Sequence, residues 1–228
     1  MPEIKSEKAI VLGAKKLGEK SFVVSLLTRE NGRYLGVYKG KNPPQPADIV
    51  DARWQARLSE QLGTFYLENL KSIAGFYLDD WGRLSCLRSI CELLNRTLPE
   101  RQIYPDLYDI VFNLINNLDS EAYVKDYIIF ELNLLTELGF GLDLSSCAGG
   151  GDKNNLAYVS PKTGHAVSLE KGMPYRDKLL LLPKFLWQDT IADENDLKNG
   201  LKLSGYFLQK NVLNGPLPDS RNYLLKNK

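Results

Sequence analysis

The hydrophobic pattern of this chain changes its period once, near residue 78. Before that point, apolar residues alternate with polar ones or form short runs between turn residues, as they do in β-strands. After it, apolar residues recur three and four positions apart, as in amphipathic helices. We therefore expect an α+β protein of more than one domain, with a β domain at 1–75 and a helical domain at 76–228.

Five short strands are predicted in the β domain. Asn31-Gly32 favours a hairpin turn, because both residue types tolerate a positive φ. Prolines exclude residues 39–48 from a central strand. Ala52, Trp54, Ala56 and Leu58 alternate with polar residues, which indicates one core face. Five short strands are best closed into a small barrel, since closure removes exposed edges. We expect the oligonucleotide/oligosaccharide-binding (OB) fold, although strand number alone does not exclude an SH3-like barrel.

The second part of the chain predicts a helical bundle with one interruption. Helices are expected at 81–95, from about Pro105, at about 121–138 and at 197–212, and Gly139 is placed to end the third of them. Residues 147–170 break this pattern with three consecutive glycines and a Pro161–Gly164 turn. The segments on either side of that turn predict a small β-hairpin inserted among the helices.

Charge is unevenly distributed along a chain whose net charge is only +1. Residues 1–72 carry 12 basic and 8 acidic side chains, residues 73–150 carry 5 and 12, and residues 151–228 carry 12 and 8. A basic segment suits a polyanion, and the alternative is an uneven solvated surface. Without a long apolar run, a signal peptide or a disulfide spacing, the chain is expected in the reducing cytoplasm.

Residue patterns that predict catalysis are missing from the sequence. The single histidine, His165, lies in the predicted hairpin, and no nucleophile elbow, phosphate loop or dinucleotide fingerprint occurs. A metal-dependent hydrolase built on Asp79, Asp80 and Glu92 is the remote enzymatic alternative. Acidic residues at a helix start more often cap the helix. We expect a protein that is not an enzyme and has no cofactor.

Nucleic-acid binding is the best-supported function, because barrels that bind single strands combine basic grooves with aromatic platforms. Tyr34 and Tyr38 are the candidate stacking residues, whereas Trp54 is expected in the core. The basic candidates lie at strand ends, in loops and on one strand face of the β domain: Lys15, Lys16, Arg29, Arg33, Lys39, Lys41, Arg53 and Arg57.

Three stretches, in order, carry a resemblance to a known family. They are Ala9–Gly13 with Lys16–Lys20, then Val23–Arg33, and then LGFGLDLSSC (138–147) followed by YVSPKTGHAVS (158–168). This order resembles the RecO family of bacterial recombination mediators. The resemblance implies an OB barrel joined to a helical domain, binding of single- and double-stranded DNA, and annealing of complementary strands.

The same resemblance implies protein partners. RecO-like proteins act with RecR to replace the single-stranded DNA-binding protein with RecA recombinase, and their helical domain receives the acidic C-terminal tail of the single-stranded DNA-binding protein. Here that tail would need a local basic patch, for which Lys198, Lys202 and Lys210 are candidates. By carry-over, the DNA contacts would lie first at Arg33, Lys39 and Lys41. A nucleoid-associated location follows, with no membrane partner.

Some members of that family hold zinc around the hairpin with cysteine pairs. Here Cys147 matches the first position, Gly150 stands where the second ligand is expected, and the second pair is missing. Cys147 with His165 supplies two ligands, whereas structural zinc needs four. We therefore expect a zinc-finger-like hairpin without zinc. The alternative function from another class is a non-enzymatic OB-fold adaptor that binds RNA or protein partners.

Overall fold

The computed structural model describes residues 3–58 and 61–226. By their internal contacts these residues form two compact units, Met1–Ser120 with Pro218–Lys228, and Glu121–Leu217. The first unit holds the β-strands of the N-terminal part together with two helices and the C-terminal segment. These units group the first two helices with the strands, so they divide the chain differently from the expected boundary at residues 75 and 76. That boundary stays a prediction.

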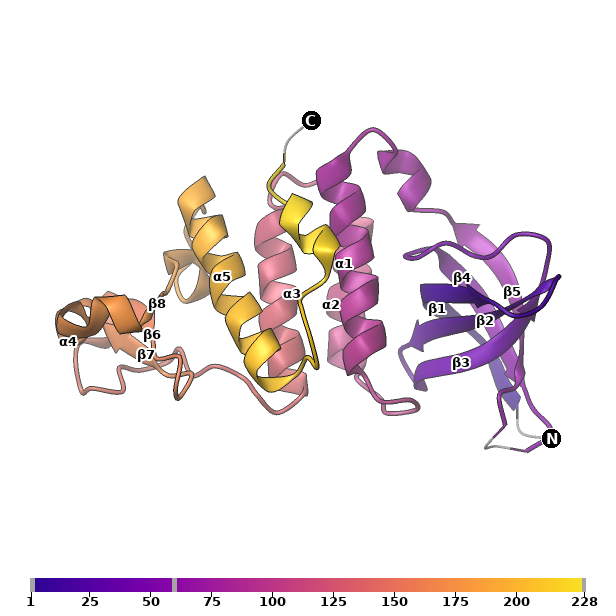
Figure 1. The fold of residues 1–228 in the computed structure, drawn as a ribbon, viewed down its shortest axis with the longest axis horizontal. Helices are drawn as coiled ribbons and strands as arrows, with labels where there is room; N and C mark the ends of the chain where they lie inside the picture. Colours follow the sequence, from indigo (N-terminus) through magenta and orange to yellow (C-terminus); the bar gives the residue numbers. More distant parts are fainter. Residues whose placement is uncertain (1–2, 59–60, 227–228) are drawn as a thin grey trace. The chain divides into compact units, whose positions relative to one another are not determined.

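A closed five-stranded barrel forms the N-terminal part of the first unit (Figure 1). Its strands follow the order β1-β2-β3-β5-β4, with β4 pairing back onto β1 and β3 running parallel to β5. This Greek-key order is that of the OB fold, so the predicted fold class is confirmed. The strands are β1 (Glu3–Lys16), β2 (Ser21–Thr28), β3 (Gly32–Lys39), β4 (Ile49–Gln55) and β5 (Thr64–Lys71).

The barrel interior is filled by one face of each strand, including the predicted core residue Trp54. Gly36 is required opposite Phe65, because a Cβ at Gly36 would lie 2.6 Å from the phenylalanine ring. Leu58 was expected on the core face, but it is 61 % exposed. The reason is that β4 already ends at Gln55, so the alternation of strand residues no longer decides where Leu58 points.

Two helices, α1 (Trp81–Thr97) and α2 (Pro105–Asn116), pack against one end of the barrel. The Asp80 side chain caps α1 by accepting from the Arg83 N–H, and Pro105 occupies the first turn of α2. The Tyr108 hydroxyl donates to the Lys8 carbonyl of β1 over 3.1 Å. The C-terminal turn η5 (Asp219–Tyr223) packs on α1, where Leu224 is fully buried.

The second unit is built on α3 (Tyr123–Glu137) and α5 (Glu194–Asn211), which pack side by side. A buried carboxylate, Glu131 of α3, accepts from the Tyr127 hydroxyl at 2.8 Å and from Ser204 Oγ of α5 at 2.5 Å. Gly139 follows α3 with φ +84°, which confirms its predicted role as the glycine that ends the helix.

A small sheet in the second unit contains the predicted hairpin. Strands β6 (Leu156–Val159) and β7 (Ala166–Ser168) form that hairpin, and β8 (Leu180–Leu181) pairs with the other edge of β6. The one-turn helix α4 (Leu169–Gly172) follows β7. Short 3₁₀ turns complete the chain: η1 (Ala74–Tyr77), η2 (Lys153–Asn155), η3 (Met173–Lys178) and η4 (Lys184–Leu186). Among residues 3–58 and 61–226, none of the helices has the length and apolarity needed to cross a membrane.

Candidate nucleic-acid interface

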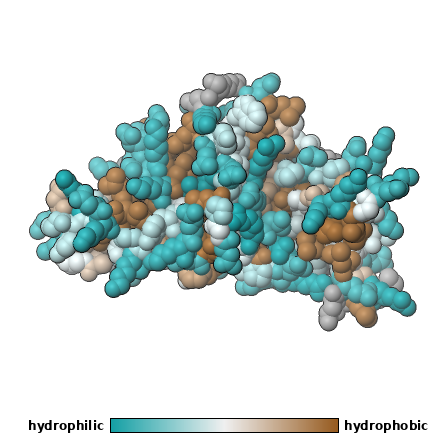
Figure 2. All heavy atoms as spheres, viewed as in Figure 1, coloured by the Kyte–Doolittle hydropathy of each residue, from teal (hydrophilic) through white to brown (hydrophobic). Residues whose placement is uncertain are grey.

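The barrel end opposite α1 and α2 carries a group of exposed lysines. Strand β1 ends there, and the Gly40 N–H donates to the Lys20 carbonyl over 3.2 Å, which places the end of β3 beside the β1–β2 loop. On the face shown in Figure 2, hydrophilic side chains project from this end around an apolar area. We call these residues the lysine rim: Lys15, Lys16, Lys20, Lys39 and Lys41.

A groove runs along the outer face of β4 and β5 and reaches the rim at Lys39. Its volume is about 730 Å³. Arg53 of β4 and Tyr66 of β5 are register partners on this face, and the Arg53 guanidinium carbon lies 4.6 Å from the centre of the Tyr66 ring. Arg57 is exposed just beyond β4. The fold thus joins the predicted residue Arg53 to the lysine rim through Lys39.

Arg29 and Arg33 do not belong to this surface, because they lie at the barrel end covered by the helices. Arg29 Nη2 pairs with Asp109 Oδ2 of α2 at 2.9 Å. Arg33 donates from Nε to the Leu98 carbonyl at 2.8 Å and lies 3.8 Å from Glu100. Its side chain is only 13 % exposed, and burial lowers the pKa of its guanidinium. Both arginines tie the barrel to the helices, and their DNA contacts stay a prediction.

The two tyrosines chosen from the sequence are partly buried against the barrel core. Tyr34 meets Trp54 edge-on with 5.5 Å between ring centres, and the Arg101 guanidinium lies 5.3 Å from the Tyr34 ring. Tyr38 borders the groove. Tyr66, another aromatic residue close to these charges, is expected from the sequence to lie in the core, but it is 48 % exposed. The alternation of β5 carried the signal, because Phe65 faces inward and its neighbour must face outward.

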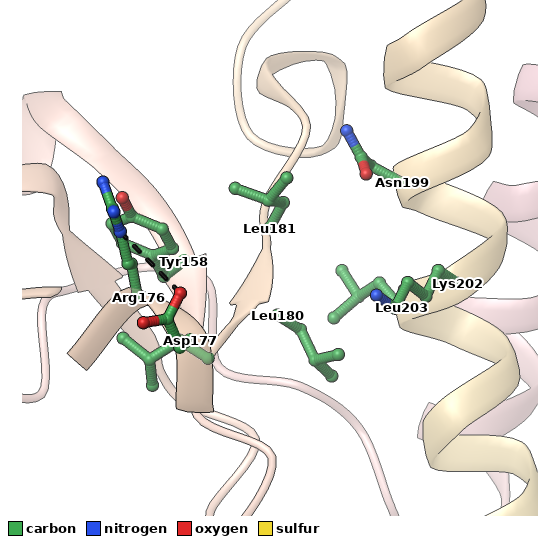
Figure 3. A pocket seen from close by; sticks show the side chains of 9 residues that line it. Tyr158, Arg176, Asp177, Leu180, Leu181, Asn199, Lys202 and Leu203 are labelled. Carbon is green, nitrogen blue, oxygen red and sulfur yellow. Dashed lines mark ion pairs between the residues drawn. The ribbon is translucent and has the colours of Figure 1, made fainter. Parts of the chain in front are cut away.

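The three lysines predicted to receive a partner lie on α5 in different surroundings. Lys198 pairs with Glu194 at 2.5 Å, and the Lys210 ammonium donates to the Pro161 carbonyl at 2.6 Å. Lys202 lines a pocket of about 350 Å³ between α5 and the small sheet (Figure 3). Arg176 lies on the opposite side of that pocket, and Leu180 and Leu203 are among its apolar lining residues.

The hairpin region holds no metal-ligand cluster. In the parts of the chain that the structure describes, no three cysteine, histidine or acidic side chains gather in a group suited to a metal ion. Cys147 Sγ accepts instead from the Ser168 N–H over 3.2 Å, and His165 Nδ1 lies 3.3 Å from Asp143 Oδ2. Both candidate ligands therefore already have non-metal contacts.

The carboxylates considered for a hydrolase are engaged separately. Asp80 caps α1 and pairs with Arg83 at 2.6 Å, and Glu92 pairs with Arg96 at 3.0 Å one turn along the same helix. Asp79 is an exposed residue before the cap. These contacts are those of helix capping and surface pairing, and they supply no shared cation site.

A five-stranded Greek-key barrel with basic loops defines a protein of the OB class, whose β2–β3 face and β1–β2 and β4–β5 loops bind oligonucleotides or oligosaccharides. Family models for recombination protein O match this chain over residues 1–76 for the N-terminal part and 78–221 for the C-terminal part. The chain therefore belongs to the RecO family.

Individual relatives agree along nearly the whole chain. The chain is 44 % identical over 215 residues to the DNA repair protein RecO of Rhodospirillum centenum, covering 91 % of this chain and 86 % of the relative. The protein of the same name from Bartonella quintana is also 44 % identical over 215 residues, with 90 % and 88 % covered. The Rhodospirillum rubrum protein is 40 % identical over 222 residues, with 91 % and 88 % covered.

Proposed function

We propose that this protein is a DNA-binding recombination mediator in DNA repair, and not an enzyme. It binds single- and double-stranded DNA, anneals complementary strands, and acts with RecR to help RecA recombinase load onto DNA coated by the single-stranded DNA-binding protein. Because its substrate is chromosomal DNA, we place it at the nucleoid in the cytoplasm. Membership of the RecO family supports the role in repair, and the lysine rim is the observation that supports DNA binding.

The rim has the chemistry that sequence-independent binding requires. Exposed ammonium groups neutralise phosphates and release the condensed counterions, and this term needs no base-reading motif. The rim includes the β1–β2 loop, which lies on the side of an OB barrel where oligonucleotides bind. Lys39 belongs both to the rim and to the lining of the groove of β4 and β5, so a strand held by the rim lies beside that groove.

Annealing follows from the same electrostatics. Two single strands repel each other through their phosphates, and a protein that neutralises both lowers this repulsion. The bases then pair by their own complementarity, so no residue has to make or break a bond. Annealing therefore needs no catalytic carboxylates, and a protein that only binds the two strands can promote it.

The first prediction concerns the rim. The variant Lys15→Ala/Lys16→Ala/Lys39→Ala/Lys41→Ala should bind single-stranded DNA more weakly, because four phosphate contacts are removed. Fluorescence anisotropy across a salt series should show a shallower plot of log affinity against log salt, by roughly 3 for four lost contacts.

A charge-matched control removes four exposed lysines of the second unit: Lys153, Lys171, Lys178 and Lys184. Its salt slope should equal that of the native chain. Rim and control variants with equal slopes would move the phosphate contacts away from the barrel. A native chain that retains no single-stranded DNA at low salt would contradict the proposed function and favour an adaptor of RNA or protein partners.

The pocket of Figure 3 suits the acidic C-terminal tail of the single-stranded DNA-binding protein, and we place that partner there. Lys202 and Arg176 lie on opposite sides of it, and Asp177, which also lines the pocket, pairs with Arg176 at 3.8 Å. A bound acidic chain would compete with Asp177 for Arg176 and meet Lys202 on the other side. Leu180 and Leu203 provide an apolar contact for the last side chain of the tail. Combined charge and apolar contact is the usual way in which a short peptide is anchored in a pocket.

The second prediction tests this docking with a labelled acidic peptide that ends in an apolar residue with a free carboxylate. Lys202→Ala should weaken peptide binding about fivefold, equivalent to roughly 1 kcal/mol. Lys198→Ala is the matched control, because Lys198 lies on the same helix outside the pocket and pairs with Glu194. Equal effects of both substitutions would show that only general surface charge attracts the peptide.

A further inference from the structure

An unusual feature of the barrel exterior is the aromatic ring of Tyr66. It stands on the outer face of β5, and Tyr66 keeps 48 % of its surface accessible although it lies on a sheet. Arg53, its register partner on β4, covers part of the ring with its guanidinium and limits the ring's freedom to reorient. A half-exposed ring held by a neighbouring cation is a preformed flat surface, so little entropy is lost when a second ring stacks on it.

The charged side chains around Tyr66 balance one another, so the groove itself has no positive excess to attract phosphate. Two carboxylates line it, those of Asp51 and Glu68. Asp51 accepts a hydrogen bond from the Ser6 hydroxyl, which keeps it in place. Lys39 and Arg53 line the groove as well and offset these two negative charges. The carboxylates can accept hydrogen bonds from the amino groups of a nucleobase. The excess of cations that suits phosphate lies at the edge of the same groove, in the lysine rim.

We propose that Tyr66 is a stacking platform for an unpaired nucleobase, so that the groove of β4 and β5 is a single-strand-specific subsite. This inference rests on the proposed function and assigns the DNA backbone and the base to two different surfaces. The lysine rim holds the backbone, and the base turns toward the groove between Lys39 and Arg53. A base in a duplex is already stacked and paired, so it cannot reach the ring without being flipped out. The rim therefore serves both forms of DNA, and Tyr66 serves only the single-stranded form.

The experiment compares three labelled probes by fluorescence anisotropy with the full chain: a single strand of mixed sequence, an abasic strand of the same length, and a duplex. The abasic strand keeps the phosphates and lacks the bases, so it isolates the contribution of stacking. Tyr66→Ala should lose roughly tenfold in affinity for the mixed-sequence strand. Its affinities for the abasic strand and for the duplex should equal those of the native chain, with an unchanged salt slope.

Two further variants control for charge and fold. Tyr66→Phe keeps the ring and should bind all three probes as the native chain does. Tyr175→Ala removes another exposed tyrosine, in the second unit, and should also bind as the native chain does. An equal loss of affinity by Tyr66→Ala on the mixed-sequence and abasic strands would overturn the inference, as would no loss on either. If the native chain still binds the probes in those cases, the proposed function stands and only the role of Tyr66 is lost. A native chain that binds no probe would overturn both the proposed function and the role of Tyr66.

Discussion

Three cysteines with identical side chains have two kinds of environment in this protein. Cys91 is buried in α1 against the barrel, and burial raises the pKa of its thiol to about 12. For Cys147, partial burial acts in the same direction, but hydrogen bonds from Ser168 and from the N–H groups of Gly149 and Gly151 outweigh it. These donors stabilise the thiolate, and the pKa of Cys147 falls to about 7.

We expect Cys147 to be the thiol that iodoacetamide alkylates first. Only the thiolate reacts, so the rate should rise with pH and level off above about pH 7, as the pKa of Cys147 is passed. Mass spectrometry of peptides after timed alkylation measures this rate. Cys147→Ser should remove the fast phase, and alkylation of Cys91 at a comparable rate would contradict the expected order.

Among the basic side chains, the residue type alone does not tell which ones are exposed and available to bind DNA. Arg33 and Lys39 stand at opposite ends of β3, and the sequence placed both among the DNA contacts. In the structure Lys39 is exposed on the rim, whereas Arg33 is nearly buried beneath α1 and the segment after it. The difference depends on where the helices cover the barrel, which no local pattern in β3 reports.

Between elements, Arg33 is expected to fasten the barrel to the end of α1. Arg33→Ala removes a charged donor from the Leu98 carbonyl and should lower the free energy of unfolding by about 1.5–3 kcal/mol. Urea unfolding followed by circular dichroism gives this value. Lys39→Ala, at the exposed end of the same strand, should change it by less than about 0.5 kcal/mol. Equal unfolding midpoints for the two variants would show that the Arg33 contacts add no stability.

Elements with a strong hydrophobic period or a clear turn signal were predictable from the sequence, and short elements with neither were not. The Asn31-Gly32 hairpin, the helices at α1 and α3 and the β6–β7 hairpin match the prediction closely. Strand β8 has two residues and α4 has four, so neither is long enough to show a period.

At the scale of the whole molecule, the chain is expected to be stable without a metal ion. Incubation with EDTA should leave the thermal midpoint unchanged, since structural zinc requires four ligands and the hairpin cysteine is held by backbone donors. Differential scanning calorimetry measures the midpoint, and elemental analysis of the purified protein provides an independent check. Stoichiometric zinc, or a midpoint lowered by several degrees with EDTA, would contradict this expectation.

The charge distribution of the whole chain bears on the proposed DNA binding in a way that the net charge hides. Five of the 12 basic residues in 1–72 form the lysine rim, while the segment at 73–150 carries the acidic excess. Asp109 and Glu100 of that acidic segment draw Arg29 and Arg33 into internal ion pairs. The lysine rim, in contrast, stays exposed at the barrel end that the helices do not cover.

The sequence by itself determined the order of the elements: a five-stranded barrel, then helices, with a hairpin inserted among the helices. This is because hydrophobic periodicity reports locally which side of an element faces a core. The surface that we propose for DNA was decided only by the tertiary structure. Whether a basic or aromatic side chain is free depends on which distant element covers it, and that depends on packing between residues far apart in the chain, such as Arg33 with Leu98 and Arg53 with Tyr66.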